Sequence, residues 1–277
     1  MQYNSLGRTG ESIPVVGQGT WGIGGEWGSN PGKDKSSIEA IRLGLELGMN
    51  LIDTAEMYGA GHSEEVVAEA LEGRRERVFV ASKVSPQHFG YEDVLRSARM
   101  SLKRLKRKQM DLYQLHWPNP KTPIAETMRA MEKLVNDGII RHIGVSNFSI
   151  EQMKEAQESL SHEKIVSNQI EYSLVDRSPE NGLLQHCQKE GVTVIAYSPL
   201  GQGRIPRGHG TPFKVLDETA KSLGRSRTQI ALAWVLQHDN VVAIPKAADK
   251  QHVQENAAAS DWKIPHNARE KLDEAFS

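Results

Sequence analysis

Three hydrophobic segments of the chain end in side chains that could move a proton. The segment Leu51-Ile-Asp53 ends in a carboxylate, Val80-Ala-Ser-Lys83 ends in an amine, and Gln114-Leu-His116 ends in an imidazole. A phenol, Tyr58, follows the first segment. If the segments are neighbouring strands of a parallel sheet, their ends meet at one edge and these groups lie within reach of one another.

The chemistry expected of these groups follows from their charges. A buried lysine needs a counter-charge, which Asp53 can supply to Lys83. An ammonium beside a phenol favours the phenolate, so Tyr58 is expected to work as an acid near neutral pH. Taken singly, Asp53 could cap a helix, Lys83 could pair with a surface acid, and His116 could be a core histidine. Their occurrence at the ends of consecutive hydrophobic segments favours a proton-transfer site instead.

Short apolar segments alternate with amphipathic ones along the chain, which predicts strands alternating with helices. The predicted strands span residues 15–21, 49–52, 78–81, 110–115, 139–145, 165–169, 192–196 and 241–244. The predicted helical segments between them span residues 38–45, 64–71, 93–105, 123–135, 150–159, 179–189 and 213–236. This α/β pattern in 277 residues favours a closed (β/α)8, or TIM, barrel as one domain over residues 1–277. An open doubly wound sheet is the alternative.

The two ends of the chain carry further elements. Turn residues between short apolar positions in residues 6–13 predict a β-hairpin that could plug one end of the barrel. Two extra helices are predicted at 250–259 and 265–276. The run Gly17-Gln-Gly19-Thr-Trp-Gly22 matches the spacing of a dinucleotide-binding fingerprint, but a glycine-rich loop follows it where that motif needs a helix. We therefore reject that reading.

Composition narrows the classes of partner. The 34 basic and 35 acidic residues nearly cancel, so no overall field would attract nucleic acid or a membrane surface. A charged leader and an apolar run of about 18 residues are both absent, which makes a soluble cytoplasmic protein the expectation. The single Cys187 excludes an internal disulfide and is expected to be a buried thiol. The ten histidines are scattered, so no metal is expected.

Several longer motifs resemble the aldo-keto reductase superfamily, in the order in which that family places them. They are Gly48-Met-Asn-Leu-Ile-Asp-Thr-Ala-Glu-Met-Tyr58-Gly, Asp111-Leu-Tyr-Gln-Leu-His-Trp-Pro118, Ile143-Gly-Val-Ser-Asn-Phe148, Ser167-Asn-Gln-Ile-Glu-Tyr172, Ala196-Tyr-Ser-Pro-Leu-Gly201 and Ile244-Pro-Lys246. The resemblance implies a barrel that binds an extended nicotinamide cofactor and reduces aldehydes or ketones to alcohols. It implies a catalytic tetrad of Asp53, Tyr58, Lys83 and His116, with Tyr58 as proton donor.

The resemblance also implies a cofactor site and a substrate site. The implied cofactor residues are Ser146, Asn147, Gln169, Tyr197, Ser198, Leu200, Gly201, Lys246, Lys250, His252, Glu255 and Asn256. NADPH is the expected cofactor and NADH is possible, because Ala247, Asp249 and His252 depart from the pattern of many relatives. The implied substrate residues, an apolar and aromatic set, are Trp21, Trp27, Met57 and Trp117.

Two other functions stay open on the sequence. One is a cofactor-sensing regulatory barrel resembling the potassium-channel β subunits. The other is a Schiff-base lyase or aldolase in which Lys83 attacks a carbonyl, since barrels host such lysines. The expected partner is a small carbonyl compound, and a monomer is favoured.

Overall fold

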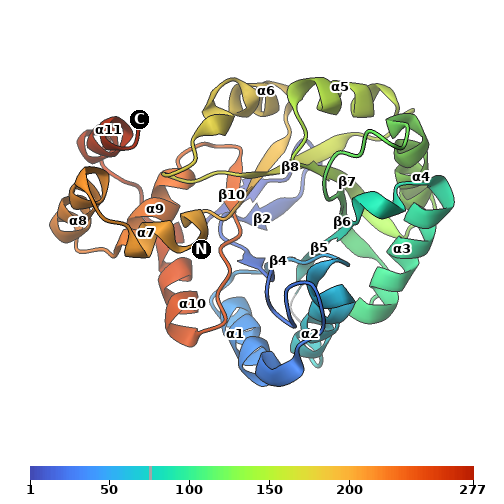
Figure 1. The fold of residues 1–277 in the computed structure, drawn as a ribbon, viewed down its shortest axis with the longest axis horizontal. Helices are drawn as coiled ribbons and strands as arrows, with labels where there is room; N and C mark the ends of the chain where they lie inside the picture. The colour runs from blue at the N-terminus through green and yellow to red at the C-terminus, as the bar shows by residue number, and fades with distance from the viewer. Residues whose placement is uncertain (75–76) are drawn as a thin grey trace.

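Eight parallel strands pair in chain order in the computed structural model, which describes residues 1–74 and 77–277 (Figure 1). The strands are β3 Gln18–Gly19, β4 Leu51–Asp53, β5 Phe79–Val84, β6 Met110–Leu115, β7 Ile140–Ser146, β8 Ile165–Glu171, β9 Thr193–Tyr197 and β10 Val241–Ala243. Each pairs with the next along the chain, as strands joined by crossover helices do.

The sheet closes on itself between its first and last strands. Parallel bridges join Val16 to Ala243 and Gly19 to Lys246, and the amide of Gly17 donates to the carbonyl of Ala243 at 2.8 Å. A β-carbon on Gly19 would lie 2.6 Å from the carbonyl oxygen of Ile244, so glycine is needed where the two edges meet. The prediction of a closed (β/α)8 barrel is confirmed, and the open sheet is wrong.

Helices cover the outside of the barrel (Figure 1). They are α1 Asp34–Glu46, α2 His62–Leu71, α3 Tyr91–Leu105, α4 Ile124–Asn136, α5 Ile150–Glu158, α6 Leu183–Glu190, α7 Arg204–Arg207, α8 Thr211–Leu223, α9 Arg227–Val235, α10 Lys250–Ala257 and α11 His266–Ala275. Short 3-10 turns lie at η1 Pro31–Lys33, η2 Tyr58–Gly61, η3 Pro86–His88, η4 Ser178–Glu180, η5 Gly201–Gly203 and η6 Ala258–Asp261. Within the described residues, no helix is both long and apolar enough to span a bilayer.

The N-terminal hairpin pairs β1 Tyr3–Ser5 with β2 Ser12–Pro14, and residues between them form the turn. Leu6 and Ile13 are fully buried in the same cluster as Leu51 and Phe79, which are the first residues of β4 and β5. The hairpin therefore closes the N-terminal end of the barrel. The opposite, C-terminal end is left for the loops that follow the strands.

The first strand differs most from its prediction. Residues 15–21 were expected to be one strand, but only Gln18–Gly19 pair regularly, with a further bridge at Val16. The chain then continues as the turns and bends of a loop as far as η1, so no helix follows the glycines as a dinucleotide fingerprint would need.

Candidate active site

The alternation of side chains along the strands aims three charged or titratable groups into the barrel. Leu51, Phe79 and Leu112 lie in the interior core, and residues two and four positions later along a strand face the same side. Asp53 on β4, Lys83 on β5 and His116 just after β6 therefore project inward at the C-terminal end. The same register leaves the other faces of the strands to pack under the helices.

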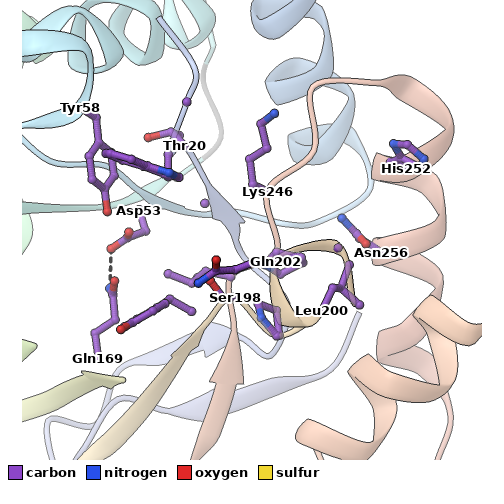
Figure 2. Close-up of a pocket in the computed structure, with 18 of the residues that line it drawn as sticks. Thr20, Asp53, Tyr58, Gln169, Ser198, Leu200, Gln202, Lys246, His252 and Asn256 are labelled. Atoms are coloured by element: carbon purple, nitrogen blue, oxygen red, sulfur yellow. Dashed lines mark hydrogen bonds between the residues drawn. The ribbon is translucent and has the colours of Figure 1, made fainter. Parts of the chain in front are cut away.

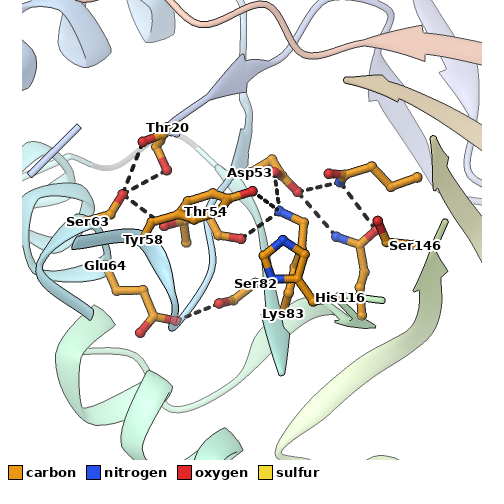
Figure 3. A network of polar contacts seen from close by, with 12 residues as sticks. Thr20, Asp53, Thr54, Tyr58, Ser63, Glu64, Ser82, Lys83, His116 and Ser146 are labelled. Atoms are coloured by element: carbon orange, nitrogen blue, oxygen red, sulfur yellow. Dashed lines mark hydrogen bonds and ion pairs between the residues drawn. The ribbon is translucent and has the colours of Figure 1, made fainter. Parts of the chain in front are cut away.

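Lys83 is the centre of the polar network at this end (Figure 3). Its ammonium lies 2.5 Å from Oδ1 of Asp53, 3.0 Å from the main-chain oxygen of Thr54 and 3.1 Å from the hydroxyl of Tyr58. The Lys83 side chain is fully buried. Three donors therefore meet three acceptors, so the ammonium is held in one orientation.

Asp53 is shared between the lysine and two glutamine amides. Gln169 donates to Oδ2 of Asp53 at 2.7 Å, and Gln114 donates to the same oxygen at 3.2 Å. Burial opposes the charge on Lys83, but Asp53 and Tyr58 outweigh it and raise the pKa of the ammonium. Lys83 is therefore protonated at neutral pH.

Tyr58 begins η2, directly below the loop that carries two tryptophans. Burial raises the pKa of its phenol, and the nearby Lys83 ammonium, which lowers it, does not compensate. Desolvation therefore penalises the phenolate more than the ammonium favours it. The phenol is protonated at neutral pH, which is the form that can give up a proton.

His116 lies beside Tyr58, with ring centroids 5.6 Å apart and the rings edge to face. Burial, followed by the charge of Lys83, lowers the pKa of its imidazole to about 3. The ring is therefore neutral at physiological pH. Its Nδ1 is buried without a hydrogen-bond partner among the described residues.

A cavity of about 1190 Å³ opens above this network at the C-terminal end of the barrel. It brings together most residues proposed from the sequence, namely Trp21, Trp27, Asp53, Met57, Tyr58, His116, Trp117, Ser146, Asn147, Gln169, Tyr197, Ser198, Leu200, Lys246, His252, Glu255 and Asn256. Three of the sequence-derived residues do not line it. Lys83 is buried beneath the floor, Gly201 is buried in η5, and Lys250 pairs with Glu39 at 2.9 Å on the surface.

Asn147 links neighbouring residues along one wall of the cavity. Tyr197 donates to Oδ1 of Asn147 at 2.9 Å, and the Asn147 amide donates to the main-chain oxygen of His116 at 3.3 Å. Asn147 has a φ of 62°, a left-handed conformation that asparagine tolerates well. This conformation turns the chain sharply at the end of β7.

The cavity extends from Tyr58 past Ser198 to Lys246, His252 and Asn256 (Figure 2). Its lining includes residues that the sequence reasoning did not single out, among them Thr20, Glu26, Lys33, Gln202 and Arg227. They lie on loops and at a helix start, where no hydrophobic periodicity marks them. The capping-box sequence Ser226-Arg-Thr-Gln229 predicts the start of α9, and could have located Arg227 there.

Arg227 supports the segment that covers this end of the cavity. Its guanidinium contacts both oxygens of Asp217, at 2.6 and 2.7 Å, and donates to the main-chain oxygen of Gly208 at 2.9 Å. Its charge is therefore already paired with a carboxylate. Arg227 ties the segment after η5 to α9 and α8.

Aromatic rings form the wall over Tyr58. Trp21 lies edge to face with Tyr58 and with Trp27, each pair of centroids 5.0 Å apart. Trp27 and Trp117 keep 69% and 48% of their surface exposed, which is unusual for tryptophan unless a ligand or partner covers it. Within residues 1–74 and 77–277, no cluster of three or more His, Cys, Asp or Glu side chains could hold a metal ion.

Comparison with known proteins agrees with this geometry. The model of the aldo/keto reductase family matches residues 15–276. Methylglyoxal reductase YeaE of Escherichia coli is 41% identical over 277 residues, which are 100% of this chain and 96% of that protein. Glyoxal reductase of Bacillus subtilis is 35% identical over 243 residues, covering 86% of this chain and 82% of that protein.

Two crystal structures have the same fold. The thermostable aldo-keto reductase Tm1743, solved with the inhibitor epalrestat, has a TM-score of 0.94 and 45% identity over 99% of this chain and 100% of its own. An aldo/keto reductase of Klebsiella pneumoniae, solved with NADP and acetate, has a TM-score of 0.91 and 36% identity over 100% and 96%. Together with the match over residues 15–276, these likenesses show that the chain belongs to the aldo/keto reductase family.

Proposed function

We propose that this enzyme reduces aldehydes or ketones to alcohols, with Tyr58 giving a proton to the carbonyl oxygen and a nicotinamide cofactor giving the hydride. The observation that carries the proposal is the 3.1 Å contact between the Lys83 ammonium and the Tyr58 hydroxyl on the floor of the cavity. General acid catalysis needs a protonated donor within reach of the substrate oxygen. The buried, protonated phenol of Tyr58 meets that need.

The neighbours of Tyr58 favour proton loss once charge develops on the substrate oxygen. Lys83, fixed by Asp53, places a positive charge beside the phenol and so stabilises the phenolate that the transfer leaves. The neutral imidazole of His116 can donate a hydrogen bond to the same substrate oxygen without adding a charge to the site. Tyr58 and His116 thus approach one substrate atom from two sides.

The residues of the cavity fit an extended dinucleotide. Beside Tyr58 they offer the amides of Asn147 and Gln169 and the ring of Tyr197, and farther along they offer the cation of Lys246 and the buried amide of Asn256. Amides can bond a carboxamide, an aromatic ring can stack on a planar heterocycle, and a cation can pair with phosphate. A nicotinamide bound there would supply the hydride. The Klebsiella structures solved with NADP and with NADPH support NADPH as that cofactor.

Small reactive carbonyl compounds are the substrate class that we propose. The reductases of methylglyoxal and glyoxal noted above carry those substrates in their names. The wall formed by Trp21, Trp27, Met57 and Trp117 offers apolar surface beside the two polar groups that would hold the carbonyl oxygen. The remaining volume of the cavity leaves room for larger aldehydes.

The Schiff-base alternative conflicts with the position of Lys83. An attacking lysine must be deprotonated and reach the substrate, whereas this side chain is fully buried, does not line the cavity and has a raised pKa. Trapping with borohydride in the presence of a carbonyl substrate is expected to leave Lys83 unmodified.

A cofactor-oxidation screen tests the proposed function. Purified enzyme is mixed with NADPH or NADH and with methylglyoxal, glyoxal, an aryl aldehyde, an aldose or a ketosteroid, and the loss of reduced cofactor is followed. We expect oxidation with the dicarbonyls and the aryl aldehyde, faster with NADPH. If neither cofactor were oxidised with any aldehyde or ketone, the proposal would be contradicted.

A further inference from the structure

Three segments of the chain meet at one buried serine behind the tetrad. Ser63, the second residue of α2, accepts a hydrogen bond from Oγ1 of Thr54 at 3.2 Å and donates to Oγ1 of Thr20 at 2.9 Å (Figure 3). Thr20 follows β3 and Thr54 follows β4. All three side chains are fully buried, so none of these hydroxyls forms a hydrogen bond with bulk solvent.

The hydroxyls of Thr54, Ser63 and Thr20 form a directed chain of two hydrogen bonds. Thr54 donates to Ser63, and Ser63 donates to Thr20, whose main-chain oxygen is also within 3.4 Å of the Ser63 hydroxyl. The main chain is pinned at the same points, because the Thr20 amide donates to the Asp53 carbonyl at 3.0 Å and the Thr54 amide donates to the Ala81 carbonyl at 2.9 Å. The position of the Thr54 residue is thereby fixed from both sides.

This chain of hydroxyls ends on a group that touches the tetrad. The main-chain oxygen of Thr54 is the third acceptor of the Lys83 ammonium, at 3.0 Å. The three protons of an ammonium point in tetrahedral directions. When two of them are held by fixed acceptors, the direction of the remaining proton is also fixed. With Asp53 and the Thr54 oxygen in place, that third proton is directed at the Tyr58 hydroxyl.

We propose that Thr54, Ser63 and Thr20 form a hydroxyl bridge that acts as a positioning element for Lys83, holding the Thr54 oxygen so that the ammonium stays aimed at Tyr58. This inference rests on the proposed role of Tyr58 as proton donor. Thr20 lines the cavity, but the bridge reaches Lys83 through Thr54 and Ser63, which do not line it. It acts on the reaction through the orientation of one ammonium.

The bridge also reaches the wall above Tyr58. Thr20 is followed directly by Trp21, whose ring packs edge to face on Tyr58 with centroids 5.0 Å apart. One buried hydroxyl of α2 therefore ties together the support of Lys83 and the ring that covers the phenol. The η2 turn directly before α2 carries Tyr58 itself, so the acid and its support lie on one continuous segment of the chain.

The test compares two substitutions at Thr54 that differ in the hydroxyl. Thr54→Val removes the donor at nearly constant volume, and Thr54→Ser keeps it. We expect Thr54→Val to lower kcat for aldehyde reduction by about tenfold, because small misplacements at a reacting centre are costly, and to leave the KM for the cofactor unchanged. Thr54→Ser is expected to recover most of that loss.

The pH profile distinguishes positioning from a general loss of structure. In the reverse reaction, alcohol oxidation, the phenolate of Tyr58 accepts the proton, so the rate rises with pH through the pKa of that phenol. The Lys83 ammonium lowers this pKa. Turning the ammonium away therefore moves the midpoint of the oxidation profile upward in Thr54→Val and not in Thr54→Ser.

Ser63→Ala provides an independent check with a smaller side chain and is expected to shift the midpoint in the same direction. If Thr54→Val and Ser63→Ala both kept the wild-type midpoint, the bridge would not position Lys83, whatever happened to kcat or to Tm. Tyr58→Phe is measured in parallel. Retention of turnover in that variant would overturn the proposed function itself, whereas its loss beside an unshifted Thr54→Val profile would overturn only the bridge.

Discussion

At the scale of single residues, the site depends on a lysine with no contact with solvent. Lys83 has acceptors for all three of its protons, and its main counter-charge, Asp53, is itself buried. A buried charge is tolerated inside a protein only when its counter-charge and its hydrogen-bond acceptors are all present. The same arrangement that directs Lys83 at Tyr58 therefore makes the folded state sensitive to each partner.

Asp53→Asn tests this dependence through stability. The substitution keeps the shape of the side chain but leaves the buried ammonium without its counter-charge, so we expect the free energy of unfolding to fall by about 3–5 kcal/mol. Urea unfolding of the purified protein measures it. Glu39→Gln is the matched control, because it breaks the exposed pair with Lys250 and should change little. Equal effects of the two substitutions would contradict the assignment.

His116 gives a prediction about pH. Its pKa is lowered to about 3 in the folded protein, below the value of about 6.5 expected when unfolded. Between these values the unfolded chain binds a proton that the folded chain does not, so stability falls as the pH is lowered. One proton corresponds to about 1.4 kcal/mol per pH unit.

The measurement is urea unfolding of the wild type and of His116→Gln at pH 7, 6 and 5. The wild type should lose more stability than the variant on going from pH 6 to pH 5. The difference isolates His116 from His142 and His238, whose pKa values burial also lowers. Parallel losses in the two proteins would show that His116 is charged in the folded state.

At the scale of elements, the ends of the strands carry the chemistry and the glycines at the seam let the barrel close. The titratable residues at three strand ends could be predicted because a hydrophobic run that stops at a titratable side chain is a local signal. The bonds from Gln114 and Gln169 to Asp53 could not, because polar residues inside a barrel give no periodic pattern. The hydroxyl contacts of Ser63 join residues distant in sequence and were missed for the same reason.

Gly19→Ala tests the seam. The new β-carbon would lie 2.6 Å from the Ile244 carbonyl oxygen, so one edge of the barrel must shift. We expect a loss of about 1–3 kcal/mol of stability, visible as a lower Tm. Gly28→Ala, where a β-carbon would meet no atom within 4 Å, is the control. A Tm for Gly19→Ala equal to that of the control would show that the two barrel edges can accommodate a β-carbon at position 19.

At the scale of the whole molecule, the cavity joins Asp53, Tyr58 and His116 to the end that Lys246 lines, here called the cationic end. The fold could be predicted from the alternation of strands and helices and from its length. The exact set of residues facing the cavity could not, because it depends on where loops and helix starts turn. Lys250 illustrates this, since it begins α10 beside the cavity but bonds outward to Glu39.

Lys246→Ala tests the cationic end. Lys246 lines the cavity at the end away from Tyr58, where we propose that the extra phosphate of NADPH binds. Removing its charge should weaken NADPH binding by about tenfold, the effect of one charge-assisted contact, and leave NADH binding nearly unchanged. Fluorescence titration with each cofactor measures both values. Lys250→Ala is the matched control, and an equal effect on both cofactors would contradict the role of Lys246.

The proposed reduction depends on the proton of Tyr58, and one comparison tests this dependence most directly. Wild-type and Tyr58→Phe enzymes are assayed for NADPH-dependent reduction of methylglyoxal, with cofactor affinity measured in the same preparations. We predict that Tyr58→Phe binds NADPH as the wild type does but loses at least about a hundredfold in kcat, the lower range for a positioned general acid. Turnover at the wild-type rate in Tyr58→Phe would contradict the account.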